Sequence, residues 1–154
     1  MTKVDVKEWF RQMPKIEARI RSREAQIRKY RDMATRATSS TEATRVSGSS
    51  NRSRVEDAVV RICDLEQDAR EDLNELKRYR RDVMAVIRRI RDVKRRDILE
   101  MHYVTGWSLE RIADEMHYHV RWVQILHGQA LTDARDVLRT MPETVRFYSL
   151  EIGD

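Results

Sequence analysis

"VEDAVVRICDLEQDAREDLNELKRYRRDVMAVIRRI", residues 55–90, contains neither proline nor glycine and repeats apolar side chains at alternating spacings of four and three. Counted from Val55, the row comprises Val55, Val59, Ile62, Glu66, Ala69, Leu73, Leu76, Arg80, Val83, Ile87 and Ile90. Only Glu66 and Arg80 in this row are polar. Such a heptad pattern is typical of a coiled coil, so the stretch predicts one long helix that packs against a second.

The second helix is predicted upstream, where Met13, Ile16, Ile20, Ile27, Tyr30 and Ala34 follow the same spacing and Arg23 is the exception. Asp5 and Glu8 predict a capping box for a short helix that ends near Gln12, and Pro14 predicts a kink or restart. Residues 37–53, "ATSSTEATRVSGSSNRS", have no apolar period and predict a loop. Residues 1–92 therefore predict a long antiparallel coiled-coil hairpin. Its thin two-helix interior favours a homodimer or higher homo-oligomer, such as a four-helix bundle.

The composition agrees with an all-α fold. The chain has 154 residues, of which 37% are charged, with four glycines and two prolines. One cysteine, Cys63, excludes an internal disulfide and is interpreted as a small buried hydrophobe. No apolar run is long enough for a membrane span and no signal peptide is evident, so we expect a soluble protein in the cytoplasm of a bacterial host cell.

Positive charge is concentrated where the long helix ends. The ten basic residues of segment 77–96, which we call the basic stripe, are Lys77, Arg78, Arg80, Arg81, Arg88, Arg89, Arg91, Lys94, Arg95 and Arg96. Segment 1–37 adds eleven basic and five acidic residues. Two interpretations stay open: a solvated helix surface, or a surface that faces phosphates.

Three shorter amphipathic segments follow the stripe, within residues 93–139. The first ends at a turn at Thr105 and Gly106, the second begins after Ser108 as N-cap, and the third begins near His119. This spacing is that of a helix-turn-helix, with the small Ala113 where two helices cross closely. Trp122 is interpreted as a core residue.

The third segment would present polar side chains to a DNA groove. Arg121 can bond guanine and Gln124 can bond adenine, although both are also ordinary helix-surface residues. The full set expected to contact DNA is His119, Arg121, Gln124, Ser108, Arg111, Lys94, Arg95, Arg96, Arg88, Arg89 and Arg91.

The stretches "WSLERIADEM" and "VQILHGQAL" resemble region 4 of sigma factors, which binds the promoter −35 element. The chain is also similar to a family of small phage and prophage proteins with sigma-like C-termini, through "EDAVVRICDLEQD" at residues 56–68. The resemblance extends from about Trp9 to Leu138. It implies a hairpin followed by a three-helix sigma region 4-like helix-turn-helix, and a DNA-binding phage or prophage regulator similar to late-gene activators of the RinA type.

The turn departs from that family's pattern. Where the family usually has Met-Gly-Tyr-Ser, this chain has Met116, His117, Tyr118 and His119. Histidine tolerates left-handed geometry better than most non-glycine residues, but it is a poorer N-cap than serine. Segment 93–139 also holds seven basic and seven acidic residues, so its net charge is zero. To bind DNA, this helix-turn-helix segment needs the basic stripe or a dimer partner to supply phosphate contacts.

Other functions find less support in the sequence. His102, His117, His119 and His127 lack the spacing of a zinc site, so we expect no metal and no cofactor. No catalytic motif is present, so we expect no enzyme. The alternative is an adaptor that docks host RNA polymerase or another regulator through the hairpin and the helix-turn-helix surface. A purely structural coiled coil would leave the helix-turn-helix without a role. Residues 140–154 are expected to form a tail, with a β-like run at 145–150.

Overall fold

The computed structural model describes residues 5–39 and 48–142, and within these ranges every regular element is helical. The all-helical prediction is therefore confirmed for the described residues. The predicted C-terminal tail lies outside them, except for residues 140–142. Among the described residues, no helix combines the length and the apolar character needed to cross a membrane.

The chain divides into two compact units. Unit 2 is Ile16–Glu75, and unit 1 combines Met1–Lys15 with Leu76–Asp154. Helices α2 (Gln12–Ser39) and α3 (Gly48–Arg88) each contribute residues to both units. The N-terminal segment thus belongs with the C-terminal helices rather than with the rest of the hairpin.

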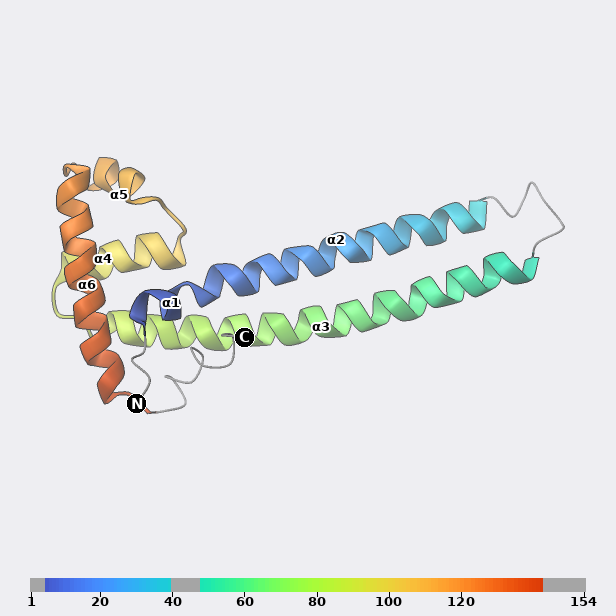
Figure 1. Ribbon diagram of the computed structural model, residues 1–154, viewed down its shortest axis with the longest axis horizontal. Helices are drawn as coiled ribbons and strands as arrows, with labels where there is room; N and C mark the ends of the chain where they lie inside the picture. The colour runs from blue at the N-terminus through green and yellow to red at the C-terminus, as the bar shows by residue number, and fades with distance from the viewer. Residues whose placement is uncertain (1–4, 40–47, 143–154) are drawn as a thin grey trace. The chain divides into compact units, whose positions relative to one another are not determined.

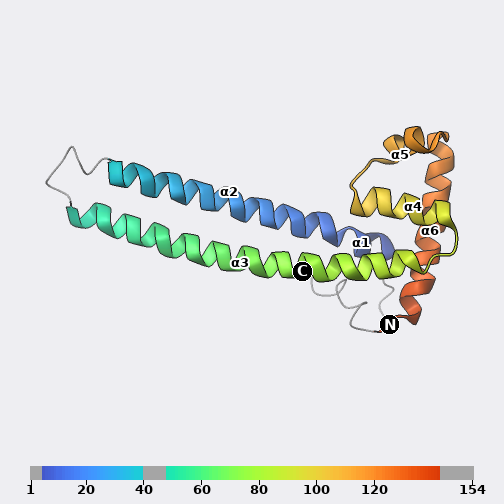
Figure 2. The ribbon, with the colours of Figure 1, turned by 180° about the vertical axis from the view of Figure 1, so that it is seen from behind.

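Unit 2 consists of two antiparallel helices that lie side by side in Figures 1 and 2. Both helices extend further than the sequence predicted, because residues 37–39 and 48–53 of the expected loop are helical. The hydroxyl groups of Thr38 and Ser39 bond backbone carbonyls one turn back, so these residues end a helix rather than start a loop. Residues 40–47 of the expected loop lie outside the described residues.

In α2 the residues of the predicted apolar row are buried or partly buried. In α3 the predicted row of buried positions is partly wrong. Val55, Ile62, Ala69 and Leu76 are partly buried, as expected. Up to Tyr79 the alternate positions are shifted by one residue, since Ala58, Leu65, Asp72 and Tyr79 are buried. At the end of the row, Val83, Ile87 and Ile90 are buried as predicted. Val59 and Leu73 are 50% and 42% exposed, and Arg80 is also exposed. Cys63 is exposed too, which corrects its interpretation as a buried residue.

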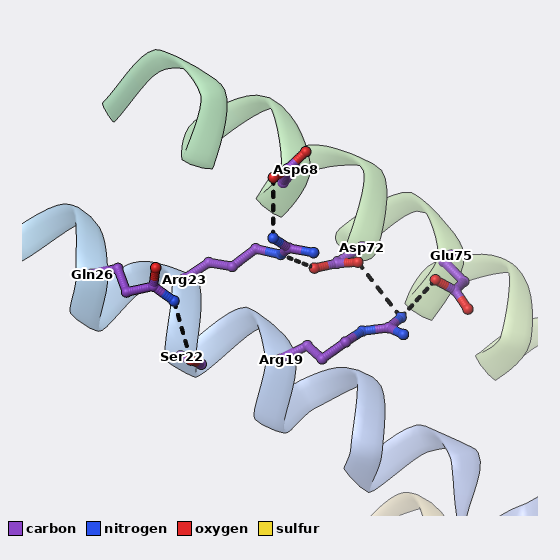
Figure 3. Close-up of polar contacts among 7 residues, drawn as sticks. All are labelled: Arg19, Ser22, Arg23, Gln26, Asp68, Asp72 and Glu75. Carbon is purple, nitrogen blue, oxygen red and sulfur yellow. Dashed lines mark hydrogen bonds and ion pairs between the residues drawn. The ribbon is translucent and has the colours of Figure 1, made fainter. Parts of the chain in front are cut away.

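Ion pairs explain how charged residues enter the interior of unit 2. Arg23, the polar exception in the α2 row, bonds Asp72 and Asp68 of α3 (Figure 3). Arg19 bonds Glu75 at 2.8 Å and also lies 3.5 Å from Asp72. The basic α2 segment is therefore neutralised by acidic residues of α3, which removes much of the case for a phosphate-facing surface there.

In unit 1, an aromatic cluster fixes the N-terminal segment. Helix α1 (Val6–Phe10) begins at Asp5, whose side chain accepts a hydrogen bond from the Lys7 backbone N–H. Glu8 does not complete a capping box but pairs with Arg11 and Lys15. The pairs in the cluster are Trp9 with Phe10, Trp9 with Tyr79, and Phe10 stacked on Tyr103 at 4.7 Å. Because Trp9, Phe10 and Tyr79 are fully buried, this cluster holds residues 5–10 in unit 1.

The remaining helices of unit 1 follow α3. These are α4 (Val93–Leu99), the π-helical turn η2 (Glu100–Val104), α5 (Leu109–Met116) and α6 (Val120–Thr140). Helix α6 contacts α4, α5 and α1. Figure 1 shows α5 beside the N-terminal end of α6. The long helix α6 is therefore the element against which the short helices α1, α4 and α5 of this unit pack.

Candidate nucleic-acid interface

Helix α5 begins and ends at residues that satisfy its backbone. Ser108 is the N-cap, and its hydroxyl accepts a hydrogen bond from the Arg111 backbone N–H at 3.2 Å. His117 follows the helix in left-handed geometry, with φ of 58° and ψ of 40°. The Tyr118 N–H then reaches back to the Ala113 carbonyl at 2.9 Å. This is the closing bond of a Schellman turn, so the backbone reverses sharply before α6.

Helix α6 begins at Val120 with His119 as its N-cap, close to the start that the sequence predicted. The His119 Nδ1 accepts a hydrogen bond from the Arg121 backbone N–H at 3.2 Å, and His119 itself is extended. Histidine therefore takes the capping role of serine at this position, and its ring is fixed close to the helix end. The side chain of Arg121 stays exposed beside it.

A small core fixes the angle between α5 and α6. Ile112 and Ala113 of α5 pack with Val123 and Leu126 of α6 and with Ile98 of α4. All five are nearly or fully buried. Because Ala113 has a small side chain, the two helices can approach closely at this point.

The exposed face of α6 is partly different from the prediction. Arg121 and Gln124 are exposed, as expected of residues that could contact a partner. Trp122 is 46% exposed, which corrects its interpretation as a core residue, and Ile125 is 45% exposed. Periodicity over residues 121–128 would have placed Ile125 on the outer side, since it lies two positions from Val123 and one from Leu126.

Two basic residues of the predicted set lie on aromatic rings. The Arg111 guanidinium is 4.1 Å from the centroid of Trp107, and the Lys94 ammonium is 5.3 Å from that of Tyr118. Both cations remain exposed to solvent. The aromatic rings restrict these long side chains, so less conformational entropy would be lost when they contact a phosphate.

Arg95 has a role within the protein. Its guanidinium pairs with Asp133 of α6 at 2.8 Å and donates to the Gln129 side chain at 2.9 Å. These bonds tie α4 to α6, which leaves Arg95 less free to contact DNA than the prediction assumed. Arg96 is partly buried.

The rest of the basic stripe faces solvent. Arg88, Arg89 and Arg91 are exposed at the end of α3 and in the connection to α4. Of the ten basic residues in 77–96, Arg95 is the one that forms an ion pair with another described residue. The stripe therefore offers positive charge that the described part of the chain does not neutralise.

Net charge is divided unequally between the two units. Unit 2 contains twelve basic and twelve acidic residues, whereas unit 1 contains 19 basic and 14 acidic. The net charge of +5 belongs entirely to unit 1. An anionic partner would therefore be attracted to the unit that carries α5 and α6.

Two histidines of unit 1 form hydrogen bonds within the protein. His102 donates from Nδ1 to the Trp107 carbonyl at 2.6 Å, and His127 Nε2 lies 2.9 Å from the Tyr103 hydroxyl oxygen. Burial, and then the charge of His102, lower the pKa of His127 to about 4. His127 is therefore neutral at pH 7. The described residues contain no group of three or more His, Cys, Asp or Glu placed to hold a metal ion.

These features define an all-helical protein with an ion-paired helix pair in one unit and a capped α5–turn–α6 arrangement in the other. A family model described as "Protein of unknown function (DUF1492)" matches residues 36–127, from the end of α2 to His127 in α6. The match covers more than half of the chain, and the chain belongs to this family. No curated protein and no solved structure matches it.

Proposed function

We propose that this protein is a phage or prophage regulator of transcription, an activator that reads promoter DNA with α5 and α6 as a helix-turn-helix. One observation carries the proposal. Arg121 and Gln124 are exposed at the start of α6, in the unit that holds the whole net positive charge. The sequence resemblance to sigma region 4 supports the same function. In this proposal the sigma-like domain follows a coiled-coil hairpin.

The two kinds of basic residue would have different tasks. Arg121 and Gln124 would bond base edges in the major groove, where guanine and adenine present distinct acceptor and donor patterns. Arg88, Arg89, Arg91, Lys94 and Arg111 would contact phosphates, which position the protein without reading sequence. The neutral charge of segment 93–139 is then no obstacle, since the end of α3 adds positive charge beside it.

Binding to a pool of random DNA duplexes tests the proposal with two matched double variants. Arg121→Ala with Gln124→Ala should weaken binding to the selected sequence about tenfold or more and remove its preference. Arg61→Ala with Gln67→Ala makes the same chemical change on exposed residues of unit 2 and should leave binding unchanged. Fluorescence anisotropy measures both.

Two results would count against the proposal in different ways. If no duplex binds in a salt-sensitive manner, the protein is not a DNA-binding regulator. If the Arg121 and Gln124 variant keeps the affinity and preference of the wild type, DNA binding stands but these two residues do not read bases.

A protein adaptor is the second candidate, and the exposure of Trp122 and Ile125 favours it. Large apolar side chains on a helix surface are common at protein interfaces. In this alternative, α6 would dock RNA polymerase or another regulator without touching DNA. Co-purification of polymerase with the wild type, lost in Trp122→Ala and unaffected by added DNA, would support the adaptor. Failure to retain polymerase in salt-free buffer would contradict it.

Self-association of the hairpin is part of the proposal. Val59, Val60 and Leu73 expose apolar surface on α3 of unit 2, and a second copy could cover it. Val59→Lys with Leu73→Lys should lower the molar mass in sedimentation equilibrium while the helical circular dichroism is kept. An unchanged mass in this variant would contradict this interface.

A further inference from the structure

The outward side of α6 has an unusual composition. Val123, Leu126, His127 and Ala130 are buried and define the inner side of this helix. At about 100° per residue, Arg121, Ile125 and Gly128 lie opposite them, with Trp122 beside Ile125. Trp122 and Ile125 thus add apolar surface to the part of α6 that points away from its own core, beside exposed Arg121, Gln124 and Gln129.

Gly128 has no role inside the described part of the protein. It lies in the middle of the 21-residue helix α6, where glycine is less stable than alanine. A Cβ added to Gly128 would meet no atom within 4 Å, and no positive φ requires glycine. The Thr132 hydroxyl bonds the Gly128 carbonyl at 3.2 Å, but any residue supplies that carbonyl. Glycine at this position leaves the helix backbone open to close approach by another molecule.

The charge of the surroundings indicates an anionic partner for this face. Unit 1 carries the whole net charge of +5, and Arg121 lies one helical turn before Ile125. A DNA duplex combines phosphates with one exposed apolar group in the major groove, the 5-methyl group of thymine. Trp122 and Ile125 offer apolar surface to such methyl groups, and Gly128 leaves room for a sugar–phosphate strand.

From these observations we propose that the face formed by Trp122, Ile125 and Gly128 contacts duplex DNA and selects thymine. Trp122 and Ile125 pack against thymine methyl groups, and Gly128 lies against the sugar–phosphate backbone. This inference rests on the proposed function, which it deepens by naming the preferred base. The residue types in the sequence predict base contacts by Arg121 and Gln124.

Replacement of thymine by uracil in the DNA tests the apolar contacts, because it removes only the methyl group. Duplexes selected by the full-length wild type are remade with single uracils. At the contacted positions the wild type should bind about fourfold more weakly, as expected for one lost methyl contact. Ile125→Ala or Trp122→Ala should bind the thymine duplex more weakly and lose this discrimination. Met33→Ala, an equally exposed apolar residue in unit 2, should keep it.

Gly128 is tested by two substitutions, whose added Cβ would meet no atom within 4 Å. Gly128→Ala should raise the midpoint of thermal unfolding by about 2–4 °C, because alanine favours the helix. The same substitution should weaken DNA binding, and Gly128→Leu should weaken it further. A variant that is more stable and yet binds less well cannot be explained by misfolding.

The outcomes separate this inference from the proposed function. Failure of the wild type to select or bind any duplex overturns both. Salt-sensitive binding with no effect of uracil at any position overturns the thymine contacts and leaves the proposed function standing. Unchanged DNA affinity in Gly128→Leu overturns the backbone contact, and assigns this face to a protein partner if Gly128→Leu also loses a co-purifying protein.

Discussion

His117 is the only non-glycine residue with a positive φ in the described part of the chain. The left-handed region costs an L-residue roughly 1–2 kcal/mol, and glycine avoids this cost. His117→Gly should therefore raise the free energy of unfolding by about 1 kcal/mol, measured by urea denaturation. The side chain of His117 is exposed, so little packing is lost.

Gly106 provides the matched control for this prediction. It has φ of 84°, and an added Cβ would meet nothing within 4 Å. Any difference in stability between alanine and glycine at this position therefore comes from backbone strain. Gly106→Ala should lower stability by about 1 kcal/mol. Equal effects of the same sign for the two substitutions would contradict the left-handed geometry of the α5–α6 turn.

His127 makes stability depend on pH. Its folded pKa of about 4 lies below the ordinary 6.5, so the unfolded chain takes up the proton first as pH falls. The neutral His127 ring makes its full contribution to the free energy of unfolding above pH 6.5, and this contribution is lost as pH falls from 6.5 to 4. The stability lost by pH 4 amounts to about 2–3 kcal/mol. His127→Gln should remove this part of the acid destabilisation, whereas exposed His117→Gln should keep it. Parallel stability–pH curves for wild type and His127→Gln would contradict this.

At the scale of elements, the register of α3 shows what a heptad pattern leaves undecided. A row of core positions that starts at Val55 can follow spacings of four then three or of three then four. Both rows contain Ile62, Ala69 and Leu76. The row through Val59, Glu66, Leu73, Arg80 and Ile87 contains three apolar side chains, and the row through Ala58, Leu65, Asp72, Tyr79 and Val86 contains four. The two counts differ by one residue, so they do not decide the register by themselves. Arg23 and Arg19 of α2 stabilise the carboxylate of buried Asp72.

Truncation of two leucines in α3 tests the register. Leu65 is 2% exposed, so Leu65→Ala should lower the free energy of unfolding by about 2–4 kcal/mol. Leu73 is 42% exposed, and Leu73→Ala should cost less than about 1 kcal/mol. Both are measured by urea denaturation at one low protein concentration, which limits any contribution from self-association. A larger loss for Leu73→Ala would restore the register predicted from sequence.

Local chemistry was predictable in the α5–α6 region, whereas tertiary packing was not. Ser108 and His119 as N-caps, and the break at His117, follow from residue types at fixed spacing. The docking of Trp9 and Phe10 against Tyr79 and Tyr103 joins residues far apart in sequence, and no local period encodes such a contact. Periodicity predicts the outward position of Ile125, whereas residue type alone points to Arg121 and Gln124 as base contacts.

At the scale of the whole molecule, charge separates two kinds of surface. Arginines of α2 are matched by carboxylates of α3 in unit 2, whose net charge is zero. Arginines at the end of α3 have no such matches among described residues, and unit 1 keeps the net charge of +5. A polyanion would therefore associate with unit 1, and its affinity would fall as salt rises.

The salt dependence of DNA affinity tests this account most directly. Each phosphate contact contributes about −0.9 to the slope of log affinity against log salt concentration. Arg88→Ala with Arg89→Ala and Arg91→Ala should make the slope shallower by up to about 3. Arg21→Ala with Arg28→Ala and Arg61→Ala removes the same charge from exposed residues of unit 2 and should leave the slope unchanged. Equal slopes for the two triple variants, or affinity that salt does not change, would contradict the account.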